Sequence, residues 1–567
     1  MTSIRVRPTP LANAASPRLS AGTLAAAAIA VCVAQVALAI PAVLNGLFQQ
    51  DLGTTSSQLT WISDAFLVPV TLLELTFGVL GDLFGRKRLL VGGALMMSLG
   101  ELIAVLTPGA SASVDTRVLV LWTGQILAGI GAAALFPTTL AMVAAGTHTV
   151  AERSRALTIW AAALASGGFV SPVLGGFVAK IGFGSDPYAS WRWAFIAVLL
   201  LGVVSAAYSA FAAQNSSAPE GRSLDWPGQI TVALALFALL YAVIQGPTSG
   251  WGSAAVVGGF VVGGVFLVLF VIVEHRSAAP LLRMDLFHNR AFAICSLVTV
   301  IGMFAYLGAA YTTSIRLAAI QGFSPLRTAV AFVLLNGMCL PLMPITKRLL
   351  ERYNPKWALG AGALSTAIGT FWLASISASD RSLLSVTVPL IVIGVGFALG
   401  VASVTAVAVN TAPNHLAGMA SGATSMLRDF GFTLGPAVIG AIALSRAASE
   451  MQAKIASNQT LQKALEAFNG AAAHVPAAQR PSVEAAIGAV NSGPLGANAV
   501  PAMVPGPAGK LVPFNPVKDV AFHALDHAYS VGYVVCGIAA LVAAVLGVLF
   551  LGGGAHETMI STGSLED

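Results

Sequence analysis

Five ionisable side chains lie inside long apolar segments and are the residues of this sequence best placed to do chemistry: Asp64, Glu74, Glu101, Arg428 and Asp429. A charged side chain is costly within a membrane and usually faces a cavity or a partner, so such residues often mark the path of an ion or a proton. In a helix, Asp64 and Glu74 are separated by about 15 Å along the axis and by roughly 80° around it. We therefore expect their carboxyl groups to line one path at two depths and to exchange protons there.

A structural role is the alternative for the other three groups. Arg428 and Asp429 are adjacent, and each would satisfy a partner on a neighbouring helix. Glu101 would lie near the external end of its segment, in the hydrated headgroup region of a bilayer. Both interpretations stay open at the level of sequence.

The composition of the chain excludes most soluble folds. Of its 567 residues, 56 % are hydrophobic and 9 % are charged, whereas an average soluble protein has about 25 % charged residues. A membrane span needs about 20 mainly apolar residues. The sequence therefore predicts an all-α polytopic membrane protein with fourteen spans, at residues 22–47, 58–81, 88–107, 117–145, 154–180, 191–213, 226–245, 253–273, 291–315, 325–349, 356–377, 383–409, 416–446 and 527–551.

The distribution of basic residues orients these spans. With the N-terminus in the cytoplasm, 16 of the 29 Lys and Arg residues fall in the N-terminal tail and the inner loops, as the enrichment of cytoplasmic loops in Lys and Arg requires. We expect an integral protein of the inner (plasma) membrane with both termini cytoplasmic. The net charge of +6 does not indicate nucleic-acid binding, because no basic run is longer than the three residues 86–88.

Two segments of the chain match each other and indicate an internal duplication. Residues 167–176 read GGFVSPVLGG and residues 431–440 read GFTLGPAVIG, at an offset of 264 positions. Two six-span halves at such an offset are typical of transporters built from repeats. The duplication predicts five regions: a cytoplasmic tail (1–21), an N-terminal six-helix bundle (22–213), a linker with spans 7 and 8 (214–290), a C-terminal six-helix bundle (291–551) and a second cytoplasmic tail (552–567).

A long loop, residues 447–526, interrupts the C-terminal bundle between spans 13 and 14. Its first part, residues 450–468, has helical spacing, and residues 492–516 are rich in Pro and Gly. It is either a cap over the external mouth or a mobile insert, and a variable surface loop is the simplest interpretation.

The loop after the second span carries the strongest family signature. Residues 78–88, GVLGDLFGRKR, are similar to the G-x-L-x-D-r-x-G-R-[KR] motif of the major facilitator superfamily, with Leu83 where a basic residue is usual. Its acid can pair with an Arg or cap the next helix, and its glycines permit a tight turn. We expect this loop to act as a charge latch on one of two alternating states, through Gly78, Asp82, Gly85, Arg86 and Lys87.

Further motifs resemble the 14-span drug:proton antiporter branch of that superfamily (EmrB/QacA type). Residues 167–176 are similar to its G-x-x-x-G-P-x-x-G-G motif, residues 191–195 to its W-R-W-x-F motif, and residues 224–228 to the L-D-W-x-G motif of the 14-span branch. The resemblance implies a major facilitator fold with two six-helix bundles and two inserted helices, acting as a monomer. It also implies a helix bend at Gly167, Ser171, Pro172, Gly175, Gly176, Gly435 and Pro436.

Two residues that usually handle protons in this family are replaced here. The acidic residue expected in span 1, nine positions before Pro41, is Cys32, and the arginine expected in span 4 is Gln125. A proton-coupled carrier needs a titratable group whose charge is linked to substrate occupancy. Asp64 and Glu74 would then take over this role.

The aromatic residues near these acids suggest a class of substrate. Trp61, Phe66 and Phe77 lie on the same segment as the two acids, and residues 61–64 are similar to the W-I-x-D motif of quaternary-ammonium exporters. A cavity formed by these side chains and Gln125 would suit lipophilic cations through charge and cation–π attraction.

The sequence predicts a secondary transporter that exports amphipathic or cationic small molecules in exchange for protons. One alternative is an uncoupled or differently coupled carrier of a lipid-like metabolite, which the two missing family charges favour. Another is a non-transporting scaffold or sensor that uses the 447–526 loop. No enzyme motif, nucleotide-binding motif or metal-ligand spacing is present, so we expect no cofactor and no metal.

Overall fold

The computed structural model describes residues 19–147, 150–184, 187–217, 224–277, 280, 282, 284–411, 417–476, 480–505 and 511–551. Its α-helices are α1 (Ala21–Ala39), α2 (Pro41–Leu52), α3 (Ser56–Phe84), α4 (Arg86–Val105), α5 (Val114–Ala145), α6 (Val150–Val178), α7 (Trp191–Ala212), α8 (Trp226–Ser249), α9 (Ala254–Arg276), α10 (Arg290–Ser314), α11 (Pro325–Gly337), α12 (Cys339–Arg352), α13 (Pro355–Ala374), α14 (Leu383–Thr411), α15 (Ala417–Ala456), α16 (Gln459–Asn469), α17 (Arg480–Asn491), α18 (Pro494–Ala499) and α19 (Lys518–Phe550).

Short elements complete the chain. They are the 3-10 helices η1 (Pro187–Ser190), η2 (Met284–His288) and η5 (Ala471–His474), the π-helix η3 (Ile315–Ile320), and the antiparallel strands β1 (Met503–Pro505) and β2 (Leu511–Pro513).

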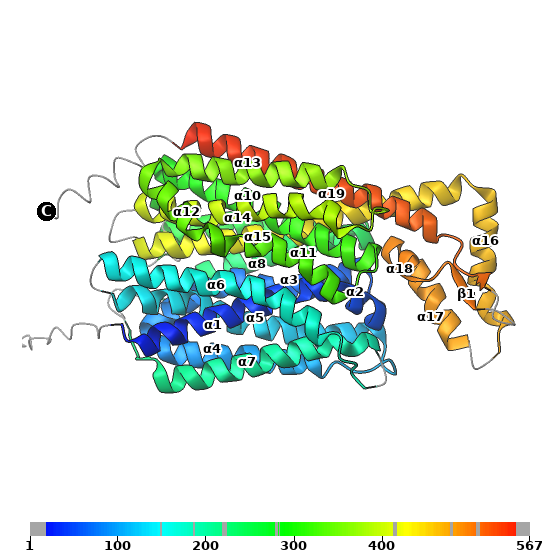
Figure 1. Cartoon of the computed structure of the whole chain (residues 1–567), viewed down its shortest axis with the longest axis horizontal. Coiled ribbons are helices and arrows are strands. Elements are labelled where there is room, and N and C mark those ends of the chain that lie inside the picture. Colours follow the sequence, from blue (N-terminus) through cyan, green and yellow to red (C-terminus); the bar gives the residue numbers. More distant parts are fainter. Residues whose placement is uncertain are drawn as a thin grey trace, which may run out of the picture.

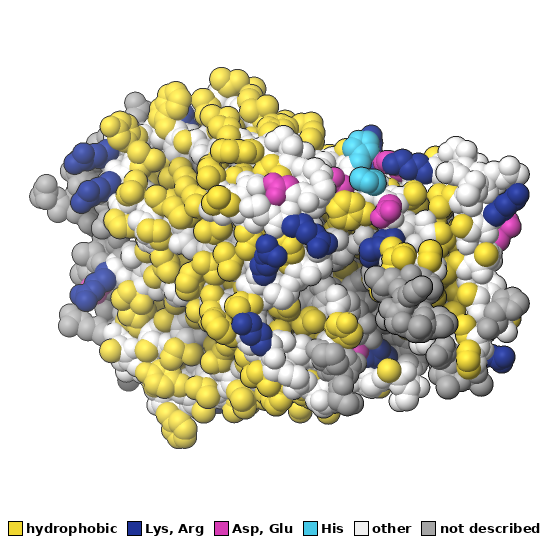
Figure 2. Space-filling model, turned by 45° about the vertical axis from the view of Figure 1, so that its right-hand side comes forward, with side chains coloured by type: hydrophobic (Ala, Val, Ile, Leu, Met, Phe, Trp, Pro, Cys, Tyr) yellow, Lys and Arg dark blue, Asp and Glu magenta, His cyan; other side chains and the backbone are white. Residues whose placement is uncertain are grey.

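Fourteen helical segments within the described residues are long and apolar enough to cross a membrane, which confirms the predicted number of spans. The first of them, Ala21–Leu52, joins α1 and α2 across the break before Pro41. Hydrophobic side chains cover the flank of the bundle that Figure 2 shows, and most of the charged side chains in that view lie toward its two ends. This distribution suits a helix bundle surrounded by lipid.

The helices form two halves that lie side by side in Figure 1, with α1 to α7 in the N-terminal half and α10 to α15 with α19 in the C-terminal half. Equivalent close contacts occur in both. A Cβ atom added to Gly167 of α6 would lie 2.5 Å from the carbonyl oxygen of Cys32 in α1, and one added to Gly431 of α15 would lie 2.6 Å from that of Val300 in α10. The two glycines are 264 positions apart, and their two partner residues are 268 positions apart. Helix packing in the two halves therefore follows the same internal duplication as the sequence motifs.

The inserted spans occupy different environments. Helix α8 packs against α3 and α15 and therefore lies where the two halves meet, whereas α9 packs mainly on α8. Val261, Val265 and Val268 of α9 are all exposed. Their exposure is expected for a helix that faces lipid, since apolar side chains are stable there.

The loop between spans 13 and 14 is shorter than predicted. Helix α15 continues to Ala456 and α19 already begins at Lys518, because ion pairs such as Glu450–Lys454 at 2.8 Å support helix beyond the apolar residues. Residues 457–517, here called the insert, fold into α16, η5, α17, α18 and the β1–β2 hairpin, at one end of the bundle (Figure 1). The rings of Phe468 and Phe514 pack edge to face at 5.1 Å in its core. We call this end of the bundle the insert end.

Candidate functional site

A row of polar side chains on α3 faces the C-terminal half. Thr60 of α3 hydrogen-bonds to the hydroxyl of Tyr311 in α10 at 2.9 Å, and Thr71 hydrogen-bonds to Thr433 in α15 at 2.9 Å. Because residues three or four apart share a helix face, Asp64 continues this row from Thr60, and Glu74 continues it from Thr71. We call this row and its partners on α10 and α15 the polar seam.

Glu74 lies within the polar seam against a charged pair of the other half. Its carboxyl group lies close to that of Asp429 and within electrostatic range of Arg428, and its Oε2 atom has no hydrogen-bond partner among the described residues. The guanidinium of Arg428 binds the carboxylate of Asp429 with both Nε and Nη2, at 2.7 and 3.1 Å. Glu74 and Asp429 are almost completely buried. Since two carboxyl groups can share a hydrogen bond only when one is protonated, this cluster is suited to hold a proton between the halves.

Asp64 occupies a less polar environment at the other end of the seam. Its side chain is fully buried, and among the described residues neither carboxyl oxygen has a hydrogen-bond partner. The phenol of Tyr311 lies within electrostatic range. Burying a carboxylate without a counter-ion or hydrogen bonds is costly, so Asp64 is a second group able to hold a proton.

Glu101 and Gln125 lie away from the polar seam, inside the N-terminal half. Helices α4 and α5 meet closely at Gly100 and Gly124, which are the sequence neighbours of these two residues. Both side chains are fully buried, and within the described residues their polar atoms have no hydrogen-bond partner. The alternative that Glu101 lies in hydrated headgroups is therefore wrong, because the surrounding helices exclude solvent from it.

The aromatic residues that were predicted to line one cavity lie in different environments in the structure. Trp61 packs against Trp122 of α5 and Phe237 of α8, with ring centroids 6.2 Å apart in both pairs. Phe66 is buried in a different hydrophobic cluster, the main core, and Phe77 is partly buried. Positions on one helix do not specify which side chains share a surface, because that depends on the neighbouring helices.

The predicted latch is an ion pair at the start of α4. Arg86 donates to Asp82 through Nη2 at 2.7 Å and through Nε at 3.2 Å. Gly85 adopts a φ of 98°, a conformation that disfavours side chains. The backbone N–H of Lys87 donates to Asn215 at 3.3 Å, so the turn binds the segment that follows α7. Gly78, farther along α3, faces Pro137 of α5.

The residues of the antiporter-like motif pack helices closely, both within and between the halves. A Cβ atom at Gly176 would lie 2.8 Å from Cα of Leu326 in α11, and one at Gly435 would lie 2.6 Å from the backbone nitrogen of Gly308 in α10. Gly175 faces Val43 of α2. Ser171 is buried, and Pro172 and Pro436 lie inside α6 and α15, where proline removes a backbone hydrogen bond.

Two polar clusters were not predicted from the sequence. The side-chain amide of Gln229 in α8 donates to the carbonyl oxygen of Leu72 in α3 at 2.5 Å and accepts a hydrogen bond from Thr76. An uncharged amide in an apolar span gives little signal in the sequence, although its neighbour Asp225 belongs to the L-D-W-x-G motif.

The second cluster surrounds Asp51 at the insert end. Its carboxylate binds the guanidinium of Arg117 and accepts from Arg192 Nη1 at 3.2 Å and from Trp191 Nε1 at 2.7 Å. The side chains of Asp51 and both arginines are at most 5 % exposed. Two of these partners, Trp191 and Arg192, belong to the W-R-W-x-F motif. This motif was the only feature of the sequence that pointed to the cluster.

Among the described residues, no group of three or more His, Cys, Asp or Glu side chains could hold a metal ion.

Comparisons with known proteins identify the relatives of this chain. A family model described as Major Facilitator Superfamily matches residues 25–436. The "Multidrug resistance protein Stp" of Mycobacterium tuberculosis is 29 % identical over 394 residues, which cover 70 % of each chain. The "Tetracenomycin C resistance and export protein" of Streptomyces glaucescens is 27 % identical and is matched over 75 % of this chain and 76 % of its own. These relatives indicate a transporter and not an enzyme.

Solved structures with the same fold include distant transporters. A bacterial homologue of the lysosomal transporter Spinster, in an inward-facing and occupied conformation, gives a TM-score of 0.57 at 15 % identity and covers 95 % of this chain and 97 % of its own. The POT family transporter PepTSo gives a TM-score of 0.58 at 16 % identity and covers 96 % of this chain and 99 % of its own. At such identities the similarity concerns the fold alone, and it agrees with the predicted all-α architecture.

Proposed function

The chain belongs to the Major Facilitator Superfamily, and we propose that it exports amphipathic or cationic small molecules in exchange for protons. Its membership makes it an integral multi-pass membrane transporter of small molecules. Export is supported by the two relatives whose names include drug resistance. Proton coupling is supported by the polar seam alone.

The observation that carries the proposal is the contact between Glu74 and the Arg428–Asp429 pair, because it joins the two halves that must separate during alternating access. A protonated Glu74 can donate a hydrogen bond to Asp429 and leaves the Arg428–Asp429 pair neutral. A deprotonated Glu74 adds a second negative charge beside Asp429 and competes for Arg428. The charge of Glu74 therefore biases how the halves fit together.

Exchange follows if cargo and proton exclude each other at these acids. A cationic molecule near Glu74 or Asp64 is attracted to the carboxylate when the acid has lost its proton. A proton on the same acid removes that attraction. Linkage makes this effect reciprocal: if a bound proton lowers the affinity for the cargo by some factor, bound cargo lowers the affinity for the proton by the same factor. Binding of the cargo therefore releases protons.

The remaining features are proposed in the same way. The N-terminal bundle comprises residues 22–213, the linker 214–290 and the C-terminal bundle 291–551, with both termini in the cytoplasm and the insert outside. A monomer suffices, since each chain holds both halves. The latch of Asp82 and Arg86 then lies on the cytoplasmic side and favours one of the two alternating states.

An uncoupled carrier of a lipid-like metabolite is the second candidate. It is favoured by Cys32 and Gln125, uncharged residues at the positions where the resemblance implies an acid and an arginine. Transport that continues after the proton gradient is abolished would select it.

Dye uptake by everted membrane vesicles, which corresponds to export from the cell, tests the proposal. Everted membrane vesicles that contain the protein should accumulate a lipophilic cationic dye such as ethidium when the interior is acidified, and an uncoupler should abolish this uptake. The combined substitutions Glu74→Gln and Asp64→Asn should remove the dependence on the gradient, whereas Glu466→Gln, at an exposed acid of the insert, should not. Unchanged uptake and pH dependence in the double variant would show that these acids do not couple transport to protons.

A further inference from the structure

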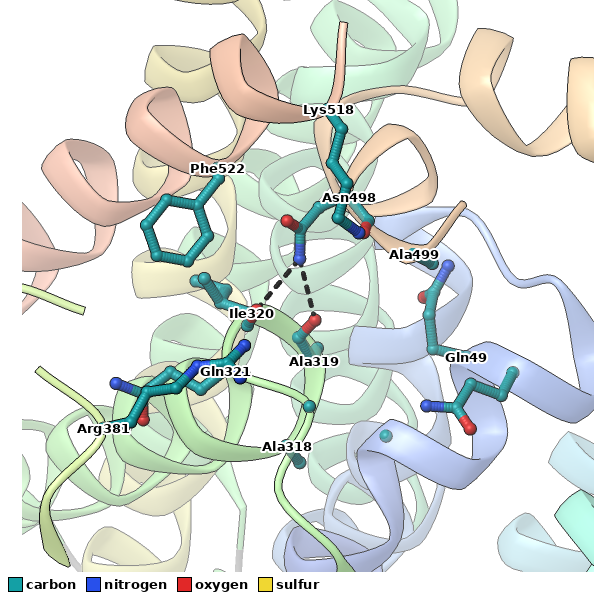
Figure 3. A pocket seen from close by; sticks show the side chains of 13 residues that line it. Gln49, Ala318, Ala319, Ile320, Gln321, Arg381, Asn498, Ala499, Lys518 and Phe522 are labelled. Atoms are coloured by element: carbon teal, nitrogen blue, oxygen red, sulfur yellow. Dashed lines mark hydrogen bonds between the residues drawn. The ribbon is translucent and has the colours of Figure 1, made fainter. Parts of the chain in front are cut away.

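A cavity of about 170 Å³ lies at the insert end, where the two halves and the insert meet (Figure 3). Gly46 and Gln49 of α2 line it from the N-terminal half, and residues 318–322, in and after η3, line it from the C-terminal half. Asn498 of α18 donates hydrogen bonds to the carbonyl oxygens of Ala319 and Ile320, both at 3.1 Å. The insert is thus fixed to η3 and forms one side of the cavity.

Two cationic side chains face this cavity, Arg381 and Lys518. They lie within electrostatic range of each other, so their like charges repel. None of the described residues that line the cavity is acidic. Asp519, which does not line the cavity, lies within electrostatic range of Lys518 and partly compensates its charge. The charge of Arg381 meets no carboxylate in the described lining.

Both cations keep donors for a ligand. The Nζ atom of Lys518 donates to the carbonyl oxygens of Asn498 and Val500, at 2.5 and 3.3 Å, and an ammonium group has a third donor. Arg381 accepts a hydrogen bond from Arg327 through its carbonyl oxygen, and within the described part of the chain no acceptor binds its guanidinium. A guanidinium is suited to the paired oxygens of a carboxylate or a phosphate.

The walls limit the size and nature of such a ligand. Phe522, Ile320 and the alanines at 318 and 319 form the apolar part of the lining. The cavity is smaller than the roughly 300 Å³ at which sites for drug-sized molecules begin. Its volume suits an anionic headgroup or a small organic anion better than a whole drug-sized molecule.

We propose that this cavity binds an oxyanion, a carboxylate or phosphate group, through Arg381 and Lys518. Since α2 and η3 belong to different halves, the complete site exists only while the halves are in contact at this end. A Cβ atom at Gly46 would lie 2.9 Å from the carbonyl oxygen of Ala318, which shows how closely they meet. Arg381 and Lys518 both belong to the C-terminal half, whereas Gln49 lines the cavity from the N-terminal half. An anion that also contacts Gln49 therefore stabilises this arrangement of the halves.

Thermal unfolding of the full-length protein in phosphatidylcholine nanodiscs tests the site without requiring transport. Inorganic phosphate or acetate, added at constant ionic strength, should raise the unfolding midpoint by at least about 2 °C in a saturable manner. Arg381→Gln, at an exposed position, should reduce the shift by more than half, and Arg381→Gln with Lys518→Gln should abolish it. Lys463→Gln, at an exposed cation of the insert outside the cavity, should keep the full shift.

Nanodiscs with phosphatidylglycerol and no added anion identify the source of the oxyanion. A higher midpoint in the wild type, but not in Arg381→Gln, assigns the site to a lipid headgroup; a response to soluble anions only assigns it to a small solute. Equal shifts in all variants, or no saturable shift with phosphate, acetate or phosphatidylglycerol, would overturn the proposal. Neither result depends on whether the protein exports cations or uses protons.

Discussion

The carboxyl group of Glu74 in α3 lies against that of Asp429 in α15, so a titratable contact joins the two halves of the transporter. The guanidinium of Arg428 binds both carboxylate oxygens of Asp429. Because the two acids belong to different halves, a change in the protonation of either one alters the interaction between the halves.

Substitutions of the two acids should be strongly non-additive. Asp429→Asn removes the partner of the partly buried Arg428, and breaking a buried pair typically costs about 3–5 kcal/mol. Ionised Glu74 can replace the lost charge, so the single variant should lose less than this. The double variant Glu74→Gln/Asp429→Asn leaves Arg428 without an acid, and its loss of stability should exceed the sum of the single losses. Unfolding midpoints of the four proteins measure this coupling; simple additivity would show that Glu74 does not interact with the pair.

The cluster around Asp51 should act as a structural clamp at the insert end. Asp51→Asn removes the carboxylate that binds the buried guanidinium of Arg117, so we expect a loss of about 3–5 kcal/mol in the free energy of unfolding. Asp115→Asn is the matched control, because Asp115 is an exposed acid that accepts a hydrogen bond from Gln58. Chemical unfolding monitored by tryptophan fluorescence should separate the two variants. Equal stability of both would contradict the clamp.

Separation of the halves at the insert end should be required for transport. The side chains of Asn45 in α2 and Ser314 in α10 hydrogen-bond at 2.8 Å across the halves. A disulfide between Asn45→Cys and Ser314→Cys should therefore form under oxidation and reduce dye transport at least tenfold, and a reductant should restore it. Each single cysteine variant serves as a control. Full transport by the cross-linked protein would show that the halves need not part here.

Asp380 should contribute to stability only above acidic pH. The hydroxyl of Ser385 and the backbone N–H of Ser382 donate to its carboxylate and hold its pKa below the ordinary value. A group whose pKa is depressed by folding adds stability that is present above its unfolded pKa, about 3.9, and is lost as the pH falls through the folded value. Asp380→Asn should therefore lower the unfolding midpoint slightly at pH 7 and not at pH 3. A larger effect at pH 3 than at pH 7 would contradict this sign.

The sequence was sufficient to predict the spans and the duplication, for physical reasons. Fourteen apolar segments specify fourteen helices, because backbone polar groups in lipid must be satisfied within a helix. The glycines at 167 and 431 occupy equivalent positions of the two matching segments, and both lie where helices pack closely, since only small residues permit such an approach. The apolar segments and the glycine-containing motifs are each short stretches of sequence, so they could be recognised without knowledge of the fold.

The arrangement of the candidate site could not be predicted in the same way. Glu74 and Asp429 were each recognisable as ionisable residues within spans, but their contact joins positions 355 residues apart and depends on how α3 and α15 face each other. The ends of α15 and α19 were missed because hydropathy detects the apolar part of a helix and not its polar continuation. The fold of the insert was missed because its hydrophobic residues, such as Phe468 and Phe514, are far apart in the sequence.

Release of protons on binding of a cation is the most direct test of the central claim that Glu74 couples cargo to protons. Purified protein in a weakly buffered solution with a pH indicator should release close to one proton for each tetraphenylphosphonium ion bound, in amounts that vary between pH 6 and pH 9. Glu74→Gln should reduce this release by more than half, while Glu466→Gln should release as many protons as the wild type. Equal release by Glu74→Gln and the wild type at every pH would contradict the account.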